Sequence, residues 1–415
     1  MTSSHARASV LETLAVAATA LLPIVARGAI LRRPRIVRMA ERADADLRLV
    51  RLLQRLRDKH GNGPLRLRVP GRSVHVVLSR ADVRRVLDGS PEPFSPANVE
   101  KRHALGHFQP DGLLISDPEE RQDRRRFTEA VLDTHSSVHE LGPVFAAKIS
   151  TEIEALLRLT GEQLDWDTFS RTWWRIVRRI VLGDAAADDE RLIERLKSLR
   201  AKGNWAYLTP SDKHHREIFL SDLREHLARG GGGSLAERIA AQPDSAHVAP
   251  ESQVAHWLFA FDAAGMATFQ ALALLASHPD KPRDHEHLRA SVLEALRLWP
   301  TTPLLLRDGE GGTVLILAPF FHRDDTVLPY ANDFEPEIWL GGRADPALVP
   351  FSGGPAVCPG RNLVLHVTAK VLASLFATHD FMLDSRELVK PLPGTLDPFG
   401  LRFAMSSREV VSSGT

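Results

Sequence analysis

The sequence predicts a mainly α-helical fold with a small β region, organised as one large domain. Between about residue 117 and residue 300, apolar residues recur mostly at intervals of three and four, the period of helices that pack on one face. The clearest alternation of apolar and polar residues is short and lies near residue 70. No internal repeat or long linker divides the 415 residues, of which 43% are hydrophobic and 25% charged, as in ordinary soluble globular proteins.

The composition narrows the classes of function. The formal net charge is +1, so bulk electrostatics gives no reason to expect a nucleic acid partner. Cys358 is the only cysteine, which excludes an internal disulfide and any zinc or iron–sulfur site built within the chain from cysteines alone. Nothing in this pattern demands secretion, and a reducing cytoplasm is the simpler location.

The N-terminal region joins an apolar stretch, residues 14–26, to a strongly basic one, residues 27–38. The apolar stretch is shorter than the roughly 20 residues that a membrane-spanning helix needs, and it lacks the cleavage site of a signal peptide. We therefore expect a helix packed on the protein. The alternative is a peripheral membrane anchor that inserts apolar side chains and attracts anionic lipid. Residues 1–34 are assigned to this segment, and residues 35–415 to a single domain.

The first regular elements expected are a hairpin and a helix. Residues 65–79 alternate apolar and polar residues around a Pro-Gly turn, which indicates two antiparallel strands. Ser79 then stands where a helix N-cap is expected, before RADVRRVL. Helices with a period of three to four follow at 145–159 and 219–228. The sequence GGGGS at 230–234 is typical of a flexible surface loop.

The stretch 254–277 is apolar for 24 residues and carries one formal charge. Hydropathy alone would accept it as a membrane span. However, Asp262, His256 and Gln270 are polar, and Gly265 lies at its centre. An apolar helix of this kind in a large soluble protein is expected to lie in the core. We therefore predict a long central helix.

The only cysteine lies in a Gly/Pro-rich stretch, 336–360, that is expected to be irregular and that leads into a helix. A helix N-terminus offers free N–H groups and a favourable dipole, which stabilise a thiolate at Cys358. Gly354 and Gly360 permit unusual backbone dihedrals and close approach to a flat ligand, and Phe351 can exclude water beside the sulfur. The alternative is that Cys358 is simply a small buried apolar side chain.

These residues resemble a known signature. Phe351-x-x-Gly354-x-x-x-Cys358-x-Gly360 resembles the haem-binding motif of the cytochrome P450 family. Further stretches that resemble family segments occur in the right order: SDPEERQDRRRF (116–127), AGMAT (264–268), EALR (294–297) and HRDDTVLPYANDFEPEIWL (322–340). The resemblance runs from about residue 60 to the C-terminus. It implies the P450 fold of the bacterial type, with haem b between a long distal helix and the helix of the cysteine loop, and with Cys358 as the iron ligand.

The resemblance also implies roles for charged residues. Glu294 and Arg297 would form the structural pair of the helix behind the haem. Arg307, Arg125 and Arg121 would bind the haem propionates, a role that suits arginine because its planar fork pairs carboxylates with two hydrogen bonds. For each of these arginines the alternative is a solvated surface position.

Two residues of the distal helix would be catalytic by the same resemblance, namely Thr268 and Gly265. The sequence nevertheless departs from the family at three positions. Ala356 replaces a cation that contacts a propionate, and Ile338 replaces an arginine that joins the Glu–Arg pair. Ala267 replaces the acid that precedes the distal threonine. The first two departures concern haem retention and stability, and the third concerns proton delivery.

The function implied by the resemblance is that of a haem-thiolate monooxygenase, an oxidoreductase that inserts one oxygen atom of dioxygen into a small apolar organic substrate. Because the chain offers neither an iron–sulfur site nor a nucleotide-binding Gly-rich fingerprint, electrons must come from a ferredoxin or flavodoxin with its reductase. We expect a monomer that binds no nucleic acid. The alternatives are a peroxide-driven or otherwise atypical haem-thiolate enzyme, and a haem-binding protein without turnover.

Overall fold

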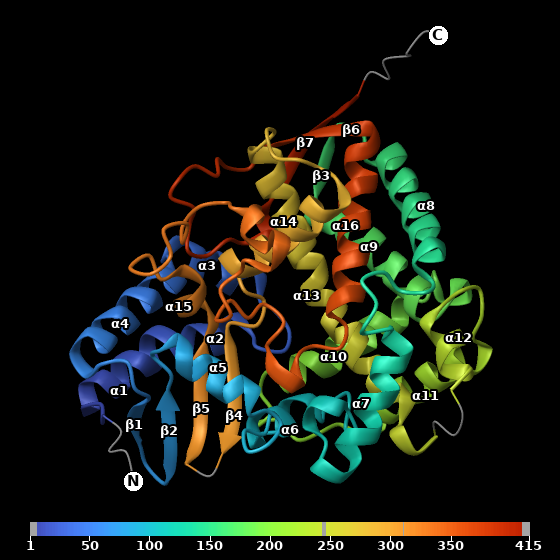
Figure 1. Ribbon diagram of the computed structural model, residues 1–415. Helices are drawn as coiled ribbons and strands as arrows, with labels where there is room; N and C mark the ends of the chain where they lie inside the picture. The colour runs from blue at the N-terminus through green and yellow to red at the C-terminus, as the bar shows by residue number, and fades with distance from the viewer. Residues whose placement is uncertain (1–5, 243–245, 310, 409–415) are drawn as a thin grey trace.

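The computed structural model describes residues 6–242, 246–309 and 311–408, and it confirms a mainly α-helical fold with two small sheets (Figure 1). The larger sheet lies beside the N-terminal helices at the lower left of the view, and most other helices lie to its right. The first helices are α1 (Val10–Val16), α2 (Leu22–Arg27), α3 (Pro34–Arg42), α4 (Ala45–His60), α5 (Arg80–Asp88), α6 (Val99–Leu105), α7 (Pro118–Leu132) and α8 (Gly142–Thr160). The later ones are α9 (Trp166–Val181), α10 (Glu190–Gly203), α11 (Lys213–Arg229), α12 (Leu235–Ala240), α13 (Pro250–Ser277), α14 (His285–Leu298), α15 (Ala318–Arg323) and α16 (Arg361–Thr378).

The four-stranded sheet has the order β1-β2-β5-β4 and joins distant parts of the chain. Its strands are β1 (Leu65–Val69), β2 (Arg72–Val76), β4 (Leu304–Gly309) and β5 (Gly312–Leu317). The predicted hairpin is confirmed, since Leu65 pairs antiparallel with Val76, whereas β2 runs parallel to β5. A three-stranded sheet has the order β3-β7-β6, formed by β3 (Gln163–Asp165), β6 (His379–Leu383) and β7 (Arg402–Ser407).

Helix α13 is the central helix of the molecule, as the sequence predicts. It packs against α9, α11, α14 and α16 and runs through the middle of Figure 1. The 18-residue window of α13 that is apolar enough to cross a membrane is 78% buried within the protein. The buried apolar side chains of α13 are part of the larger of the two main hydrophobic clusters, so the helix belongs to the core.

The N-terminal segment packs on the rest of the protein. Helices α1 and α2 are joined by a π-helical turn, Ala17–Leu21, and bury Val16, Ala20 and Ile24 in the second hydrophobic cluster. The buried Arg27 forms a 2.7 Å ion pair with Asp46 of α4. Helix α3 begins at the predicted boundary, but the packing continues across it. The inner face of the segment therefore packs on the protein, as expected. The whole stretch Val10–Arg27 is nevertheless long and apolar enough to cross a membrane, and only 22% of it is buried.

Other local predictions are also confirmed. Ser79 caps α5, because its hydroxyl accepts the backbone N–H of Asp82. The stretch 336–360 is mostly irregular, with two short 3₁₀ turns at Pro336–Gly342 and Gly354–Ala356. Helix α16 begins directly after it, at Arg361, so the cysteine lies just before a helix N-terminus.

Candidate functional site

The cysteine loop holds the sulfur through its backbone. The N–H of Cys358 donates to the carbonyl oxygen of Phe351 at 3.0 Å, which closes the loop. The backbone N–H groups of Gly360 and Arg361 lie near enough to the Cys358 sulfur to lower its pKa, and the Arg361 N–H donates to the Cys358 carbonyl oxygen at 3.3 Å. Burial nevertheless raises the pKa of Cys358 and outweighs these donors. The helix end therefore acts in the predicted direction, and a bound metal would have to displace the remaining proton.

The two glycines of the loop have different backbone conformations and different surroundings. Gly354 has a φ of +62°, and a Cβ there would lie 2.1 Å from the carbonyl oxygen of Leu87. It therefore needs both the left-handed backbone and the missing side chain. Gly360 has an ordinary φ of −86°, so the prediction of an unusual dihedral is wrong at this position. A Cβ on Gly360 would lie 4.0 Å from the Cys358 sulfur, on the same side as the metal ligand.

Two of the three predicted propionate-binding arginines reach the cysteine loop. Arg307 donates from Nη2 to the Ser352 hydroxyl at 2.9 Å, directly after Phe351. Arg125 donates from Nη1 to the Val357 carbonyl at 2.7 Å and pairs through Nε with Glu129. Arg125 therefore also clamps the loop.

Arg121 and a lysine that the sequence interpretation missed complete a group of cations. Arg121 donates from Nη1 to the carbonyl oxygen of Leu113 at 3.1 Å, on the segment before α7. Lys101 of α6 donates from Nζ to the carbonyl oxygen of Leu306 at 2.9 Å, and so lies beside Arg307 on β4. No periodicity or motif singles out Lys101. Only the tertiary fold brings α6 to β4.

The electrostatics of this group show a surplus of buried positive charge. Burial, followed by repulsion from Arg307, lowers the pKa of Lys101 well below its ordinary value. Burial, with repulsion from Arg121, lowers the pKa of Arg307 to about 10. Burial, with repulsion from Arg125, likewise lowers the pKa of Arg121 to about 10. Because the positive charges of these side chains repel one another, negatively charged groups bound beside them would stabilise the charged forms.

The predicted Glu294–Arg297 pair is completely buried. Arg297 binds both carboxylate oxygens of Glu294, at 2.6 and 2.8 Å, and its remaining donors bind backbone carbonyls of the segment 322–333. Ile338 makes no polar contact of this kind. Instead, the neighbouring Trp339 donates from its indole Nε1 to Glu294 at 2.8 Å. The missing arginine is thus replaced by a different donor one position later, which the sequence interpretation did not foresee.

The predicted catalytic stretch of α13 is buried. Thr268 is fully buried and donates from its hydroxyl to the carbonyl oxygen of Ala264 at 2.8 Å. A Cβ on Gly265 would lie 2.7 Å from Nε1 of Trp173, so Gly265 permits close packing of α9 on α13. Asp262 is held by Arg200 at 2.7 Å and is engaged outside the Thr268 site.

One face of α13 keeps accessible surface although the helix is central. His256, Phe259, Ala260 and Ala263 are partly accessible, whereas most of their neighbours are buried. Their spacing of three and four places them on one face. Nδ1 of His256 has no hydrogen-bond partner among the described residues, and burial lowers the pKa of this histidine to about 4. The imidazole is therefore neutral at physiological pH.

The three consecutive leucines of β4, Leu304 to Leu306, fall into two sets. Leu304 and Leu306 are partly accessible and lie on one face of the strand. Leu305 faces the other way and is buried in the second hydrophobic cluster. Leu304 and Leu306 also pack against this cluster, but their remaining accessible surface makes them, with Ala260 of α13, candidates to line a pocket.

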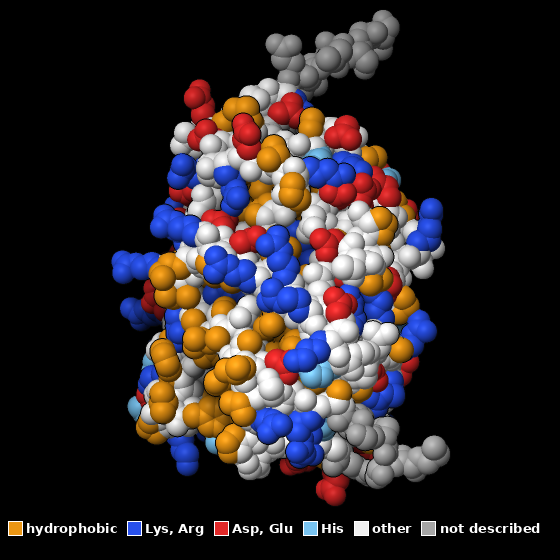
Figure 2. All heavy atoms as spheres, turned by 90° about the vertical axis from the view of Figure 1, so that its left-hand side faces the viewer, with side chains coloured by type: hydrophobic (Ala, Val, Ile, Leu, Met, Phe, Trp, Pro, Cys, Tyr) orange, Lys and Arg blue, Asp and Glu red, His pale blue; other side chains and the backbone are white. Residues whose placement is uncertain are grey.

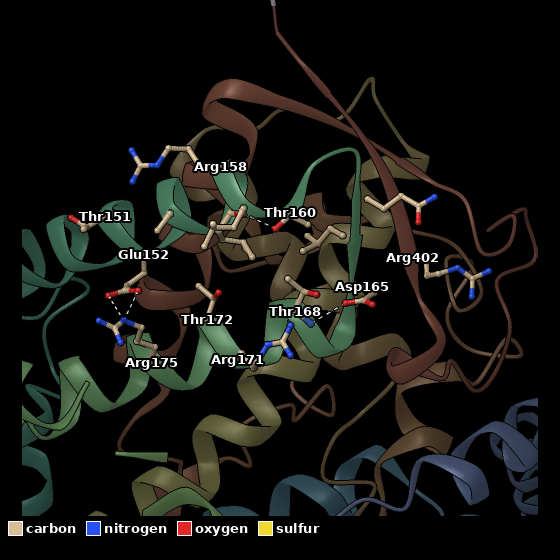
Figure 3. A pocket seen from close by; sticks show the side chains of 15 residues that line it. Thr151, Glu152, Arg158, Thr160, Asp165, Thr168, Arg171, Thr172, Arg175 and Arg402 are labelled. Atoms are coloured by element: carbon tan, nitrogen blue, oxygen red, sulfur yellow. Dashed lines mark hydrogen bonds and ion pairs between the residues drawn. The ribbon is translucent and has the colours of Figure 1, made fainter. Parts of the chain in front are cut away.

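A surface cavity of about 690 Å³ lies elsewhere, between α8 and α9 (Figure 3). Glu152 and Arg175 are bonded to each other at one side, and Arg158 and Arg402 lie at opposite ends with their guanidinium groups pointing apart. None of the predicted site residues lines this cavity. It is therefore separate from the cysteine site.

Residues 284–402 match the family described as cytochrome P450, and this stretch contains the Glu294–Arg297 pair and Cys358. A cyclooctat-9-en-7-ol 5-monooxygenase from Streptomyces melanosporofaciens is 26% identical over 380 residues, which cover 75% of this chain and 79% of the relative. The C-terminal part of the chain thus matches the cytochrome P450 family, and the chain as a whole is similar to a monooxygenase over most of its length.

Further comparisons agree with a P450 fold. A retinoic acid-bound cyanobacterial CYP120A1 and the cytochrome P450 CYP102L1 superpose with TM-scores of 0.66 and 0.69, each at 18% identity over 86% of this chain and 94% of the other. Ferruginol synthase 1 from Rosmarinus officinalis is 34% identical over 137 residues, and the chain covers 28% of the length of that plant P450.

The cofactor of the P450 family is a haem, and the residues present fit one. Cys358 offers a sulfur ligand with two backbone donors behind it. The surplus positive charge of Lys101, Arg121 and Arg307 offers partners for two propionates. Glycine at 360 keeps the loop backbone free of a side chain next to the sulfur, and glycine at 354 lets the loop approach the backbone of Leu87.

Proposed function

We propose that this P450 is a haem-thiolate monooxygenase that inserts one oxygen atom of dioxygen into an apolar organic substrate. The observation that carries the proposal is the position of Cys358, partly accessible at the end of the signature loop and directly before the N-terminus of α16. Haem b, when bound, supplies the activation of dioxygen. The chain supplies the ligand, the orientation of the substrate and the control of protons.

The residues have separate tasks in this proposal. The Cys358 sulfur would bind the haem iron, and the nearby backbone N–H groups of the helix start would tune the electron density that the ligand gives. Lys101, Arg121 and Arg307 would bind the propionates. The Thr268 hydroxyl, which donates to the Ala264 carbonyl, can accept a hydrogen bond from water and keep one water in place. Ala267 offers no group that can pass a proton.

We propose a substrate class from the site and from the relatives. The relatives are named as a cyclooctat-9-en-7-ol 5-monooxygenase, a ferruginol synthase and a drimenol monooxygenase. The name of the first describes an apolar alcohol as substrate. On α13, Phe259, Ala260 and Ala263 are apolar, and His256 adds one neutral hydrogen-bonding group on the same face. An apolar ring skeleton with a single hydroxyl group matches this arrangement.

Spectral titration tests the substrate class. Cyclic terpene alcohols and the corresponding hydrocarbons would be added to the holoenzyme, and displacement of water from the haem followed by the Soret shift. Wild type should bind the alcohol about tenfold more tightly, and His256→Phe should abolish this preference while keeping hydrocarbon binding. Equal preference in both proteins would contradict the role of His256, and no shift with any ligand would contradict the substrate class.

We also propose external redox partners, a ferredoxin or flavodoxin with its reductase. Arg361 is exposed directly after the cysteine loop and offers positive charge for an acidic partner, whereas the exposed Arg126 is paired with Asp123. The neighbouring Arg124 is buried and bound to Ser116 and Glu120, so it takes no part in such a face. We place the enzyme in the cytoplasm as a monomer.

The second candidate function is peroxide-driven oxidation, which Ala267 favours because no acid precedes Thr268. Dioxygen uptake coupled to NAD(P)H, measured with surrogate ferredoxin and reductase, should accompany product formation. Product formed only with hydrogen peroxide would establish the second function instead. A haem spectrum without turnover under either condition would point to a haem-binding protein without catalysis.

A further inference from the structure

The N-terminal helical segment exposes an apolar stripe to solvent. Large apolar side chains on α1 and α2 are strongly exposed: Leu11 by 78%, Leu14 by 58%, Leu22 by 63% and Val25 by 50%. Ala18 and Ala29 are also exposed and continue the same spacing of three and four. The stripe therefore follows one face of the segment from end to end.

A helix packed on the surface of a soluble protein normally turns polar side chains outward. Here the opposite face is already used, because Val16, Ala20 and Ile24 are buried in the second hydrophobic cluster. The segment is thus apolar on both sides, and the outer side has no partner among the described residues. An exposed stripe of this length marks an interaction surface.

The loop that follows α10 extends this surface. Trp205, Tyr207 and Leu208 are exposed by 50%, 62% and 81%. The loop is fastened to the end of the N-terminal segment, since the Asn204 side chain accepts the backbone N–H of Ile30 at 2.9 Å. The Arg33 guanidinium also lies 4.5 Å from the centre of the Trp205 ring. Tryptophan and tyrosine are the residues that prefer the boundary between lipid and water.

Positive charge lies next to the apolar stripe. Arg35 of α3 and Arg48, Arg51 and Arg55 of α4 are exposed and have no ion pair among the described residues. The face shown in Figure 2 is the left-hand side of Figure 1, where α1, α3 and α4 lie. On it, hydrophobic side chains gather in the lower left part, and a band of Lys and Arg side chains lies above them.

We propose that this face docks on an anionic lipid bilayer, with α1 and α2 lying parallel to the membrane surface. The apolar stripe would enter the boundary between head groups and acyl chains, and the arginines would bind acidic head groups. The exposed arginines of α3 and α4 favour anionic lipid over a second copy of the chain, because two such faces in contact would place arginines against arginines. Docking does not depend on the proposed oxidation and can be tested without substrate.

The segment lies on the membrane and does not span it. Spanning would require α1 and α2 to leave the body of the protein. That movement would break the buried Arg27–Asp46 pair and the two hydrogen bonds by which Asn204 holds Ile30 and Leu31. It would also expose the inner apolar face. A bound state that keeps these contacts needs only the outer stripe.

Vesicle flotation tests the proposal with the full chain in its haem-bound form. Wild type should float with vesicles of 70% phosphatidylcholine and 30% phosphatidylglycerol and much less with pure phosphatidylcholine. Leu14→Gln/Leu22→Gln should reduce the bound fraction on anionic vesicles at least tenfold. The matched control is Met382→Gln/Val389→Gln, which changes two side chains of similar exposure, 65% and 64%, outside the patch. It should float like wild type.

Two further measurements keep the outcome unambiguous. Arg51→Gln/Arg55→Gln should weaken flotation and make it less sensitive to salt, because it removes the electrostatic part alone. Circular dichroism should show that every variant stays folded. Equal flotation of wild type and Leu14→Gln/Leu22→Gln would overturn the proposal. A second result would also overturn it: light scattering shows that the wild type is a dimer and the variant a monomer, and neither protein binds vesicles.

Discussion

The indole Nε1 of Trp339 donates a 2.8 Å hydrogen bond to the carboxylate of Glu294, which is completely buried. Glu294 also accepts the backbone N–H of Glu335 at 2.9 Å, so the carboxylate joins α14 to the segment before the cysteine loop. Trp339 therefore takes over one contact that an arginine at position 338 would make in the family pattern.

Trp339→Phe should destabilise the protein by about 2 kcal/mol, because it removes a hydrogen bond to a charged group and leaves the buried carboxylate one donor short. Urea unfolding checks this. The control is Trp174→Phe, which removes a buried indole that makes no hydrogen bond among the described residues. If both substitutions lower the free energy of unfolding by the same amount, the hydrogen bond of Trp339 contributes nothing beyond packing.

Lys101→Met should have opposite effects on the apoprotein and the holoprotein. Without haem, the variant removes a partly buried cation that Arg307 repels, so the apoprotein should melt at a higher temperature. With haem, a charge-assisted bond to a propionate is lost, and transfer of haem to apomyoglobin should be roughly tenfold faster, since such a bond is worth about 1.5–3 kcal/mol. A lysine with only a structural role would shift both measurements in the same direction.

Ala356→Arg should have little effect on haem retention if Lys101 already supplies the missing cation. The same substitution in the Lys101→Met background should restore slow haem loss. Haem transfer rates of the two single variants and the double variant provide the measurement. A large gain from Ala356→Arg alone would mean that one propionate of the wild-type protein lacks a partner.

Ala267→Asp should raise the amount of product formed per NAD(P)H consumed. Ala267 is buried directly before Thr268, and Asp262 is occupied by Arg200, so no nearby acid supplies protons on α13. General acid help is typically worth 10²–10⁴-fold. Ala267→Asn has the same size but cannot deliver a proton, and it should leave coupling unchanged. If the wild type already forms nearly one product per NAD(P)H and Ala267→Asp lowers this ratio, protons must reach the site by another route.

His256→Phe should reduce the loss of stability in acid. The pKa of His256 is about 4 in the folded protein and about 6.5 in an unfolded chain. Only the unfolded chain takes up this proton between those values, so stability falls as the pH drops from 6.5 towards 4. At pH 4.5 the effect is roughly 2–3 kcal/mol. Urea unfolding at pH 7 and pH 4.5 should show a smaller difference for His256→Phe than for wild type or for the exposed-site control His214→Phe.

Local patterns explain what the sequence could predict. The hairpin at 65–79, the cap at Ser79 and the helix after Cys358 are each defined by neighbouring residues, and all three are present. The polar residues that interrupt the long apolar stretch of α13 likewise predict its place in the core, which the structure confirms. The partners of those polar residues, such as Arg200 for Asp262, depend on tertiary structure.

The remaining features depend on contacts between distant parts of the chain. Lys101 acquires its role only because α6 meets β4. Trp339 replaces the expected arginine from a neighbouring position, which a motif read position by position misses. The pKa of Cys358 is raised because burial outweighs the helix end, and burial is a property of the whole fold.

The parallel pairing of β2 with β5 has a consequence for biosynthesis. Val76 pairs with Leu315, so the sheet that begins near the N-terminus is completed only after most of the chain has left the ribosome. The second hydrophobic cluster likewise combines Ala8 and Val16 with Phe320 and Val349. Until then, strand β2 has an open edge and the early helices expose both of their apolar faces. The nascent chain should therefore depend on chaperones during translation, and slower synthesis should lengthen the time during which it can aggregate.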